Sequence, residues 1–432
     1  MKPLLLALLI FALPAAAEAR LSPAEQKMIA TVEQERERTI ALLEKMVNQN
    51  SGTLNLAGVE AVGSMVRAEL EPLGFEVKWV PMAETGRAGH LIASHQGDGR
   101  GKRLLLIGHL DTVFEPDSPF QRFEREGARA IGPGVGDNKG GVSVMIAALR
   151  AMHAAGTLED ADIEVVLTGD EEKVGLPVAA ARGDLVAAGK RADIALDFEG
   201  LAQEDGEDLG SIARRSSSSW TVTATAKSGH SSGIFGVEAG YGAAYELARI
   251  LDGFRRSLPE PNLTFNVGIL AGGAIVEGDP ERTRASASGK TNIIPARAIA
   301  HGDIRTLSAE QSTRVREKME AIVARHLPGT EAGIEFHEGG YPPMAPTPGN
   351  RALLAKLNAV NRDLGLAEMG ELDPLKRGAG DIAFVAGEVD GLIGLGTAGG
   401  GSHAPGEYIE LDSLDRQAKR AAILMSRLAG ER

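Results

Sequence analysis

Histidine and carboxylate side chains follow several short apolar segments of this sequence, at the point where each segment ends. They are His109, Asp111, Glu171, Glu172, Glu199 and His403, together with Asp137 in a glycine-rich loop that leads into a helix. Nitrogen and oxygen ligands without sulfur suit catalytic zinc, with cobalt or manganese as possible substitutes. So many carboxylates would raise one another's pKa unless cations lay between them. These residue types therefore favour a pair of divalent metals that activates water for hydrolysis.

The adjacent acids Glu171 and Glu172 suggest a division of roles. In an extended backbone neighbouring side chains diverge, so one can bind a metal while the other faces the water as general base. Asp111 points the same way as His109 along an extended segment and could accept the other ring N–H of that histidine. Each motif alone is usually structural. Their joint placement is what favours a catalytic site.

The apolar segments predict strands buried on both faces of a parallel-rich mixed sheet. The predicted strands cover residues 103–107, 163–168, 193–197 and 391–395, and the predicted helices cover 25–49, 56–73 and 141–154. This is an α/β pattern. In such sheets ligands bind at the carboxyl ends of the strands, which would bring the metal-binding side chains to one edge.

A second pattern begins near residue 219, where polar and apolar residues alternate. Alternation predicts strands with one exposed face, usually antiparallel. Strands are expected at 220–226, 263–269, 292–304 and near 333–337, with helices at 237–258 and 309–327. The order β-α-β-β-α-β is ferredoxin-like. We expect a lid or dimerisation domain at 214–330, inserted into a catalytic domain formed by 20–213 and 331–432, with the Pro-rich stretch 341–348 as the return linker.

Composition excludes several other classes of protein. The 432 residues include no cysteine, which rules out disulfides, thiolate zinc sites, iron–sulfur clusters and a cysteine nucleophile. The net charge of −13 and the lack of basic runs argue against a nucleic-acid partner.

Residues 1–19 have the order of a secretory signal: Lys2, an apolar run, then small residues. The apolar run is too short to span a bilayer. We expect cleavage after Ala17 or Ala19, a secreted or periplasmic protein, and no membrane attachment after cleavage.

Eight motifs together resemble a known family. They are His109-Leu-Asp111, Gly136-Asp-Asn-Lys-Gly-Gly141, Thr168-Gly-Asp-Glu-Glu172, Asp197-Phe-Glu199, Lys227-Ser-Gly-His-Ser231, Thr291-Asn-Ile-Ile-Pro295 with Asp303-Ile-Arg305, Gly378-Ala-Gly-Asp381, and Ser402-His-Ala-Pro-Gly-Glu407. Their order is similar to that of the glutamate carboxypeptidase and aminoacylase family of dizinc hydrolases. The resemblance covers essentially the whole chain after the signal.

The resemblance implies a role for each matching residue. Asp137 would bridge two zinc ions, Glu172 and His403 would complete one metal site, and His109 and Glu199 the other. Glu171 would be the general base that takes a proton from a water between the metals, and Asp111 would support His109.

The resemblance also implies a homodimer formed through the inserted domain. His230 would reach the partner subunit's site and stabilise the oxyanion, while Asn292 and Arg305 would hold the substrate's free carboxylate. Arg377 departs from the more glycine-rich family pattern and is a candidate for a further substrate contact, or a surface residue. Residues 277–290 form a polar insertion without an assigned role.

The implied activity is hydrolysis of the amide bond of a C-terminal or N-acylated amino acid, as in glutamate carboxypeptidases. N-acyl-amino-acid deacylase and dipeptidase activities share the same chemistry. A serine hydrolase is a rival reading, because Gly229–Gly233 matches a nucleophile elbow around Ser231, followed in order by Asp381 and His403. Such an elbow tops a strand buried on both faces, whereas residues 220–226 alternate. A non-catalytic periplasmic binding protein would need no cluster of metal ligands.

Overall fold

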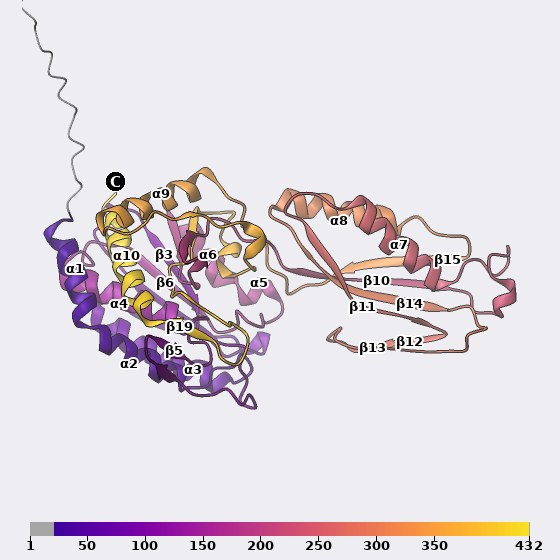
Figure 1. The fold of residues 1–432 in the computed structure, drawn as a ribbon, viewed down its shortest axis with the longest axis horizontal. Helices are drawn as coiled ribbons and strands as arrows, with labels where there is room; N and C mark the ends of the chain where they lie inside the picture. The colour runs from indigo at the N-terminus through magenta and orange to yellow at the C-terminus, as the bar shows by residue number, and fades with distance from the viewer. Residues whose placement is uncertain (1–20, 432) are drawn as a thin grey trace, which may run out of the picture.

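A six-stranded mixed sheet forms the centre of the larger domain in the computed structural model, which describes residues 21–431 (Figure 1). Its strands, in spatial order, are β1 (Glu76–Pro81), β2 (Gly89–His95), β6 (Ile163–Thr168), β3 (Leu104–His109), β7 (Ile194–Asp197) and β17 (Gly391–Ile393). The last four are parallel to one another, while β1, β2 and β6 pair antiparallel. The predicted α/β fold with a parallel-rich mixed sheet is confirmed.

Helices cover both faces of this sheet. One face carries α1 (Pro23–Gln34), α2 (Arg36–Val47), α3 (Leu56–Leu70), α4 (Lys139–Ala155) and α10 (Leu411–Ala429), with α9 (Pro348–Asp363) packed against α10 and β17. The other face is covered by α6 (Gly183–Arg191), beside which lies the short α5 (Val178–Ala181). Successive residues of β3 serve the two cores: Leu104 and Leu106 pack on the α4 side, Leu105 and Ile107 on the α6 side. This double burial is the reason that β3 is apolar without alternation.

The helix predicted over residues 25–49 is two helices. Glu35 interrupts it, ending α1 and preceding α2, and both helices pack against α4. The apolar periodicity continues through the break because both segments face the same neighbour. Periodicity alone therefore did not reveal it.

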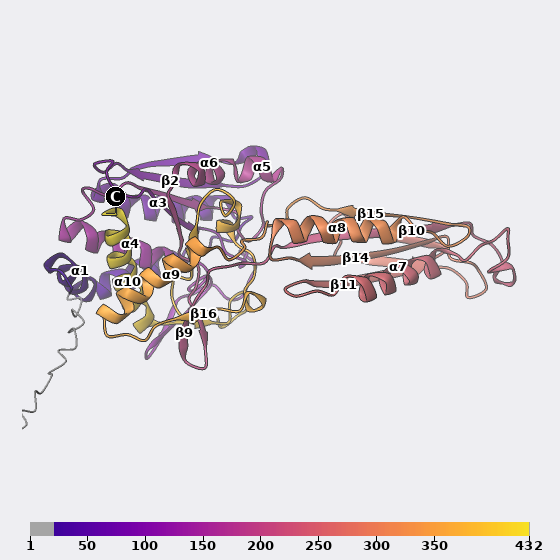
Figure 2. The same ribbon diagram turned by 90° about the horizontal axis from the view of Figure 1, so that it is seen from above.

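The smaller domain is a four-stranded antiparallel sheet with two helices on one face (Figures 1 and 2). Its strands, in spatial order, are β11 (Thr264–Gly273), β14 (Arg297–Arg305), β10 (Ser218–Ala226) and β15 (Thr330–Phe336), and its helices are α7 (Ala243–Ser257) and α8 (Ala309–Val323). The ferredoxin-like order of the inserted domain is confirmed. The polar insertion at 277–290 forms most of a hairpin, β12 (Ile275–Gly278) and β13 (Ala285–Ser288), beside β11.

The boundary placed after residue 330 falls too early. Strand β15 pairs with β10 from Thr330 to Phe336, so these residues belong to the small sheet. The two connecting segments cross between the domains where Ser217 pairs with Tyr341 and Arg214 pairs with Met344. The return to the larger domain thus begins at the Pro-rich stretch itself.

Two small sheets flank the main one. The first contains β8 (Ala202–Glu204), β9 (Glu207–Gly210) and β16 (Gly370–Glu371); the second contains β4 (Glu124–Glu126), β5 (Arg129–Ile131), β18 (Gly399–Gly400) and β19 (Tyr408–Glu410). Within residues 21–431 the helices are all too short or too polar to cross a membrane. The predicted signal sequence, 1–19, lies outside the described residues.

The core of the small domain gives a stability prediction. Phe254 is 1% exposed and meets the buried Trp220 edge to face at 5.6 Å between ring centroids. Replacing Phe254 with Ala should lower the stability of this domain by about 3–5 kcal/mol through lost burial and a cavity. Urea unfolding followed by Trp220 fluorescence in a Trp79→Phe background would measure it. Tyr245→Ala, on the same helix but 51% exposed, is the matched control; an equal loss in both variants would contradict the prediction.

Candidate metal centre

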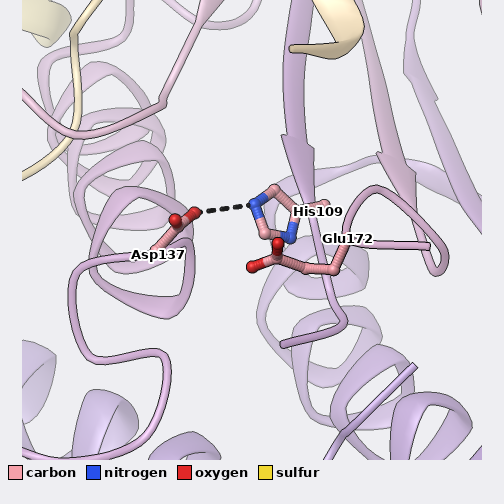
Figure 3. Close-up of side chains that lie close together, drawn as sticks. All are labelled: His109, Asp137 and Glu172. Carbon is pink, nitrogen blue, oxygen red and sulfur yellow. Dashed lines mark hydrogen bonds and ion pairs between the residues drawn. The ribbon is translucent and has the colours of Figure 1, made fainter. Parts of the chain in front are cut away.

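The carboxylate of Asp137 lies between two imidazoles, those of His109 and His403, and Figure 3 shows it facing His109. Its Oδ1 is 3.0 Å from Nε2 of His109, and its Oδ2 is 3.1 Å from Nε2 of His403. Each oxygen therefore faces a different histidine. This is the disposition that a carboxylate needs to bridge two cations.

Each histidine also faces a glutamate. Oε1 of Glu199 is 3.4 Å from Nε2 of His109, and Oε2 of Glu172 is 3.2 Å from Nε2 of His403. One donor atom each from His109, Asp137 and Glu172 lies within 4.8 Å of the other two. The five residues thus form two His–Glu pairs that share Asp137.

The elements that carry these residues explain their convergence. His109 ends β3, Glu199 follows β7 and Glu172 follows β6, so three neighbouring parallel strands deliver side chains to the same edge. Asp137 precedes α4. His403 lies in the loop between β18 and β19 with φ of 65°, a left-handed conformation that is strained for a side chain larger than glycine and that recurs at functional sites.

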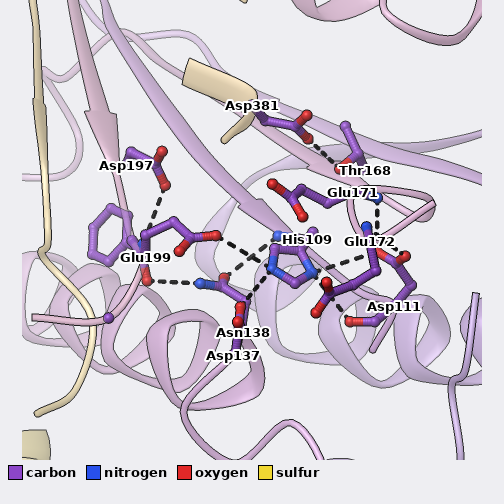
Figure 4. A network of polar contacts seen from close by, with 12 residues as sticks. His109, Asp111, Asp137, Asn138, Thr168, Glu171, Glu172, Asp197, Glu199 and Asp381 are labelled. Carbon is purple, nitrogen blue, oxygen red and sulfur yellow. Dashed lines mark hydrogen bonds and ion pairs between the residues drawn. The ribbon is translucent and has the colours of Figure 1, made fainter. Parts of the chain in front are cut away.

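Two carboxylates that do not face the histidine Nε2 atoms organise the loops around them. Glu407 accepts hydrogen bonds from the backbone N–H groups of Gly134, Gly136 and Asp137, at 3.1, 2.8 and 2.9 Å. Asp111 accepts the backbone N–H groups of Glu171 and Glu172, at 3.0 and 3.1 Å. The bonds to Glu407 hold the loop that carries Asp137 in place. Those to Asp111 hold the acidic loop, which follows β6 and carries Glu171 and Glu172 (Figure 4).

Asp111 differs in detail from its predicted role. Nδ1 of His109 is 3.1 Å from the backbone oxygen of Asp111 and 3.4 Å from its Oδ1. The backbone carbonyl is therefore the nearer hydrogen-bond acceptor for the ring. The carboxylate mainly receives the peptide groups of the acidic loop and the hydroxyl of Thr53, at 2.6 Å.

The histidines and acids of the cluster shift one another's pKa values. Burial disfavours the charged imidazolium, yet hydrogen bonds to Asp111, Asp137 and Glu199 raise the pKa of His109 well above its usual value. Hydrogen bonds to Asp137 and Glu172 raise the pKa of His403 to about 11. Burial and then neighbouring acids raise the pKa values of Glu171 and Glu172.

The donor set fits divalent cations on two further grounds. Oε1 of Glu172 is buried and has no hydrogen-bond partner among residues 21–431, so it is available to a ligand. A metal ion would also replace the protons that the acids and imidazoles otherwise hold. Nitrogen and oxygen donors of this kind suit zinc in an open catalytic site.

Glu171 stands beside the cluster at the edge of a cavity of about 350 Å³. The cavity is lined by Asp137, Glu171, Glu199, Arg214, Arg377 and His403, among others. Arg377 lies inside this cavity, not on the outer surface, and its Nη2 is 3.9 Å from Glu199. Arg214, which also lines the cavity, was not predicted from the sequence to belong to the site. Its Nη1 is 3.7 Å from Glu199, and Gly380 leaves room for it, since a Cβ there would lie 2.0 Å from that nitrogen.

The other predicted substrate-binding residues, His230, Asn292 and Arg305, do not line this cavity. His230 and Asn292 lie at the outer end of the small domain, where Ser231 N–H donates to Asn292 O at 2.9 Å. Strand β10 leads there from the crossing, and its nine residues span roughly 30 Å. Arg305 ends β14 at the inner end. A single chain therefore does not bring His230 or Asn292 to its own metal-binding residues.

The geometry excludes the serine triad within one chain. Ser231 lies with His230 at the outer end of the small domain. Asp381 is buried in the larger domain, where it accepts from Arg182 Nε at 2.8 Å and from Thr168 Oγ1 at 2.5 Å. The two residues do not meet.

Several residues of the site were not singled out from the sequence. Asn138 accepts from His109 N–H at 3.4 Å and donates to Phe198 O at 3.0 Å, which joins the ends of β3 and β7. Its position inside the motif Gly136–Gly141 could have identified it as a site residue. Thr53 and Tyr341 carry no such signal, because their partners are distant in sequence.

Comparison with known proteins agrees with this geometry. A sequence model of Peptidase family M20/M25/M40 matches residues 105–427. The chain is 29% identical to carboxypeptidase G2 of Pseudomonas sp. (strain RS-16) over 90% of its own length and 89% of the relative's. It is 25% identical to a succinyl-diaminopimelate desuccinylase of Leptothrix cholodnii over 70% of its length and 77% of that protein. Its fold matches a tripeptidase from Staphylococcus aureus with a TM-score of 0.70 at 18% identity, covering 91% of this chain and 98% of the other. The predicted resemblance is confirmed, and the chain belongs to Peptidase family M20/M25/M40, as a hydrolase of peptide or related amide bonds.

Proposed function

We propose that this protein is an exported, homodimeric, dizinc exopeptidase that cleaves the amide bond of a C-terminal or N-acylated amino acid, in the manner of a glutamate carboxypeptidase. The observation that carries the proposal is the shared carboxylate of Asp137, with one His–Glu pair at each of its oxygens and Glu171 beside them. N-acyl-amino-acid deacylase or dipeptidase activity on the same site is the second candidate. The similarity of the chain to desuccinylases as well as to a carboxypeptidase supports this second candidate activity.

Five residues would hold the metals. His109 and Glu199 would bind one ion, His403 and Glu172 the other, and Asp137 both; cobalt or manganese could replace zinc. When bound, such ions polarise a carbonyl and lower the pKa of water towards neutrality.

Glu171 would act as the general base. Its carboxylate takes a proton from the attacking water and passes it to the leaving nitrogen of the amide. Asp111 would support this step by holding the peptide N–H of Glu171. A buried carboxyl whose pKa is raised is suited to accepting and then releasing a proton near neutral pH.

Substrate binding would draw on both domains and on two chains. Arg305 and Asn292 would hold the free carboxylate, and Arg377 would contact the substrate inside the cavity. His230 would stabilise the oxyanion in the site of the partner subunit. The distance of His230 and Asn292 from their own metal-binding residues supports this arrangement.

Export is proposed from the sequence of residues 1–19. N-terminal sequencing of the protein recovered from the periplasm or medium would test it. A chain that still begins at Met1 would contradict cleavage.

A substrate screen tests the function directly. The zinc-loaded protein is assayed on N-acyl amino acids, dipeptides and peptides with different C-terminal residues, with and without a chelator. Metal-dependent release of a single amino acid supports the proposal. Activity that survives chelation but is lost to a fluorophosphonate would favour Ser231, and tight binding without turnover would favour a binding protein.

Glu171→Gln should remove the base while leaving the metal-binding residues intact. We expect kcat to fall between about 100- and 10,000-fold with unchanged metal content. Steady-state kinetics and metal analysis would measure both. Glu172→Gln is the matched control at the next residue, and it should lose metal. Wild-type kcat in Glu171→Gln would remove the proposed base.

His230→Ala and Glu171→Gln chains, each nearly inactive, should complement each other when mixed. A mixed dimer has one site with an intact Glu171 and a His230 from the partner, so random exchange should restore about a quarter of wild-type activity. Activity is measured after unfolding and refolding the mixture. No recovery, although mixed dimers form, would place His230 in its own chain's site.

Arg377→Gln should weaken substrate binding, because it removes a cation from the cavity. We expect kcat/KM to fall about tenfold or more, mainly through KM, with metal content retained. Arg362→Gln, which removes an exposed pair with Glu368, is the control. Equal kinetics in both variants would return Arg377 to a structural role.

A further inference from the structure

The two segments that join the domains are bonded to each other at Tyr341. Ser217 N–H donates to Tyr341 O at 3.0 Å, and Tyr341 N–H donates to Ser217 O at 2.7 Å. Arg214 and Met344 form a second such pair, at 2.9 and 2.8 Å. Figures 1 and 2 show the small domain attached to the large one only through this narrow crossing. Any rotation of the small domain therefore bends the backbone near Tyr341.

The side chain of Tyr341 leads from this crossing into the larger domain. Its hydroxyl donates to the backbone oxygen of Glu171 at 2.5 Å and accepts from Arg182 Nη2 at 3.2 Å. Because a guanidinium has only donors, the phenolic oxygen must accept from Arg182, and its single proton is left for Glu171. The ring packs against Phe384 at 5.1 Å between centroids.

Arg182, which donates to the Tyr341 hydroxyl, is itself held firmly in place. It is 1% exposed and donates to Asp170 at 2.6 Å and to Asp381 at 2.8 Å. These two hydrogen bonds set the position of the guanidinium that donates to the Tyr341 hydroxyl.

The peptide groups of Glu171 are consequently held on both sides. Its N–H is bound by Asp111, within the larger domain, and its C=O by Tyr341, at the crossing. The side chain between these two anchors is the proposed base. A catalytic group must be held to within a fraction of an ångström, and misplacement by about 1 Å costs roughly 100-fold in rate.

We propose that Tyr341 is a positioning residue that couples the orientation of Glu171 to the hinge of the small domain. The hydroxyl transmits movement of the crossing to the peptide that carries the base. The proposal rests on the proposed role of Glu171 and adds a residue outside the eight motifs.

Tyr341→Phe tests this role because it keeps the ring and removes only the hydroxyl. We expect kcat to fall about 10- to 100-fold, while KM and metal content stay at wild-type values and the protein stays folded at the assay temperature. Tyr245→Phe, at a half-exposed position, is the control for hydroxyl removal and should match the wild type. Phe384→Leu, which loosens the ring packing but keeps the hydroxyl, should retain most of the kcat.

Coupling to the hinge needs its own measurement. The chain contains no cysteine, so the double variant Glu44→Cys, Glu317→Cys carries labels only at two exposed positions, one in each domain. We expect Tyr341→Phe to broaden the distribution of distances between the labels. The same distribution in both proteins would overturn the coupling.

The remaining outcomes are distinct. Unchanged kcat in Tyr341→Phe overturns the positioning role, as does a loss of kcat accompanied by loss of metal, a higher KM or unfolding at the assay temperature. A wild-type protein that hydrolyses nothing in the substrate screen would instead defeat the proposed function.

Discussion

The carboxylate of Asp137, placed between two imidazoles, imposes a constraint on everything around it. Three further acids, Glu171, Glu172 and Glu199, lie in the same small volume, and bringing like charges together out of water is costly. The chain tolerates this arrangement because the rest of the fold holds the loops rigidly enough to prevent the acids from moving apart. The buried sheet edge supplies part of that rigidity, and the hydrogen bonds to backbone groups supply the rest.

Carboxylates that accept hydrogen bonds from the backbone shape the site as much as those that face the two histidines do. Glu407 accepts from three N–H groups of the loop that carries Asp137, and Asp111 accepts from two N–H groups of the acidic loop. Glu407 comes from the same loop as His403. Two parts of the site that are distant in sequence, near residues 137 and 403, are therefore fixed to each other directly. A displacement of the loop that carries His403 would therefore also move Asp137.

The convergence of most of the candidate metal ligands could be predicted from the sequence because each lies near the end of a buried apolar strand, and strand ends of a parallel sheet converge. The fold class and the inserted domain followed from the change between continuous and alternating apolar patterns. Arg214 and Tyr341 could not be predicted, since their contacts join positions more than 150 residues apart. The break at Glu35 was invisible because the residues on both sides face α4. The sequence could not show that the backbone oxygen of Asp111 lies nearer to His109 Nδ1 than the Asp111 carboxylate does, because only coordinates distinguish the two.

The paired crossing at Ser217 and Tyr341 also bears on the history of the chain. The inserted domain leaves and re-enters the larger one through neighbouring, hydrogen-bonded residues, so its two ends are already adjacent. A segment with adjacent ends can be gained, exchanged or lost without rethreading the core that hosts it. The α/β body, with its complete sheet and its own hydrophobic core, is thus a self-contained unit, and the small domain is a module that selection can vary independently.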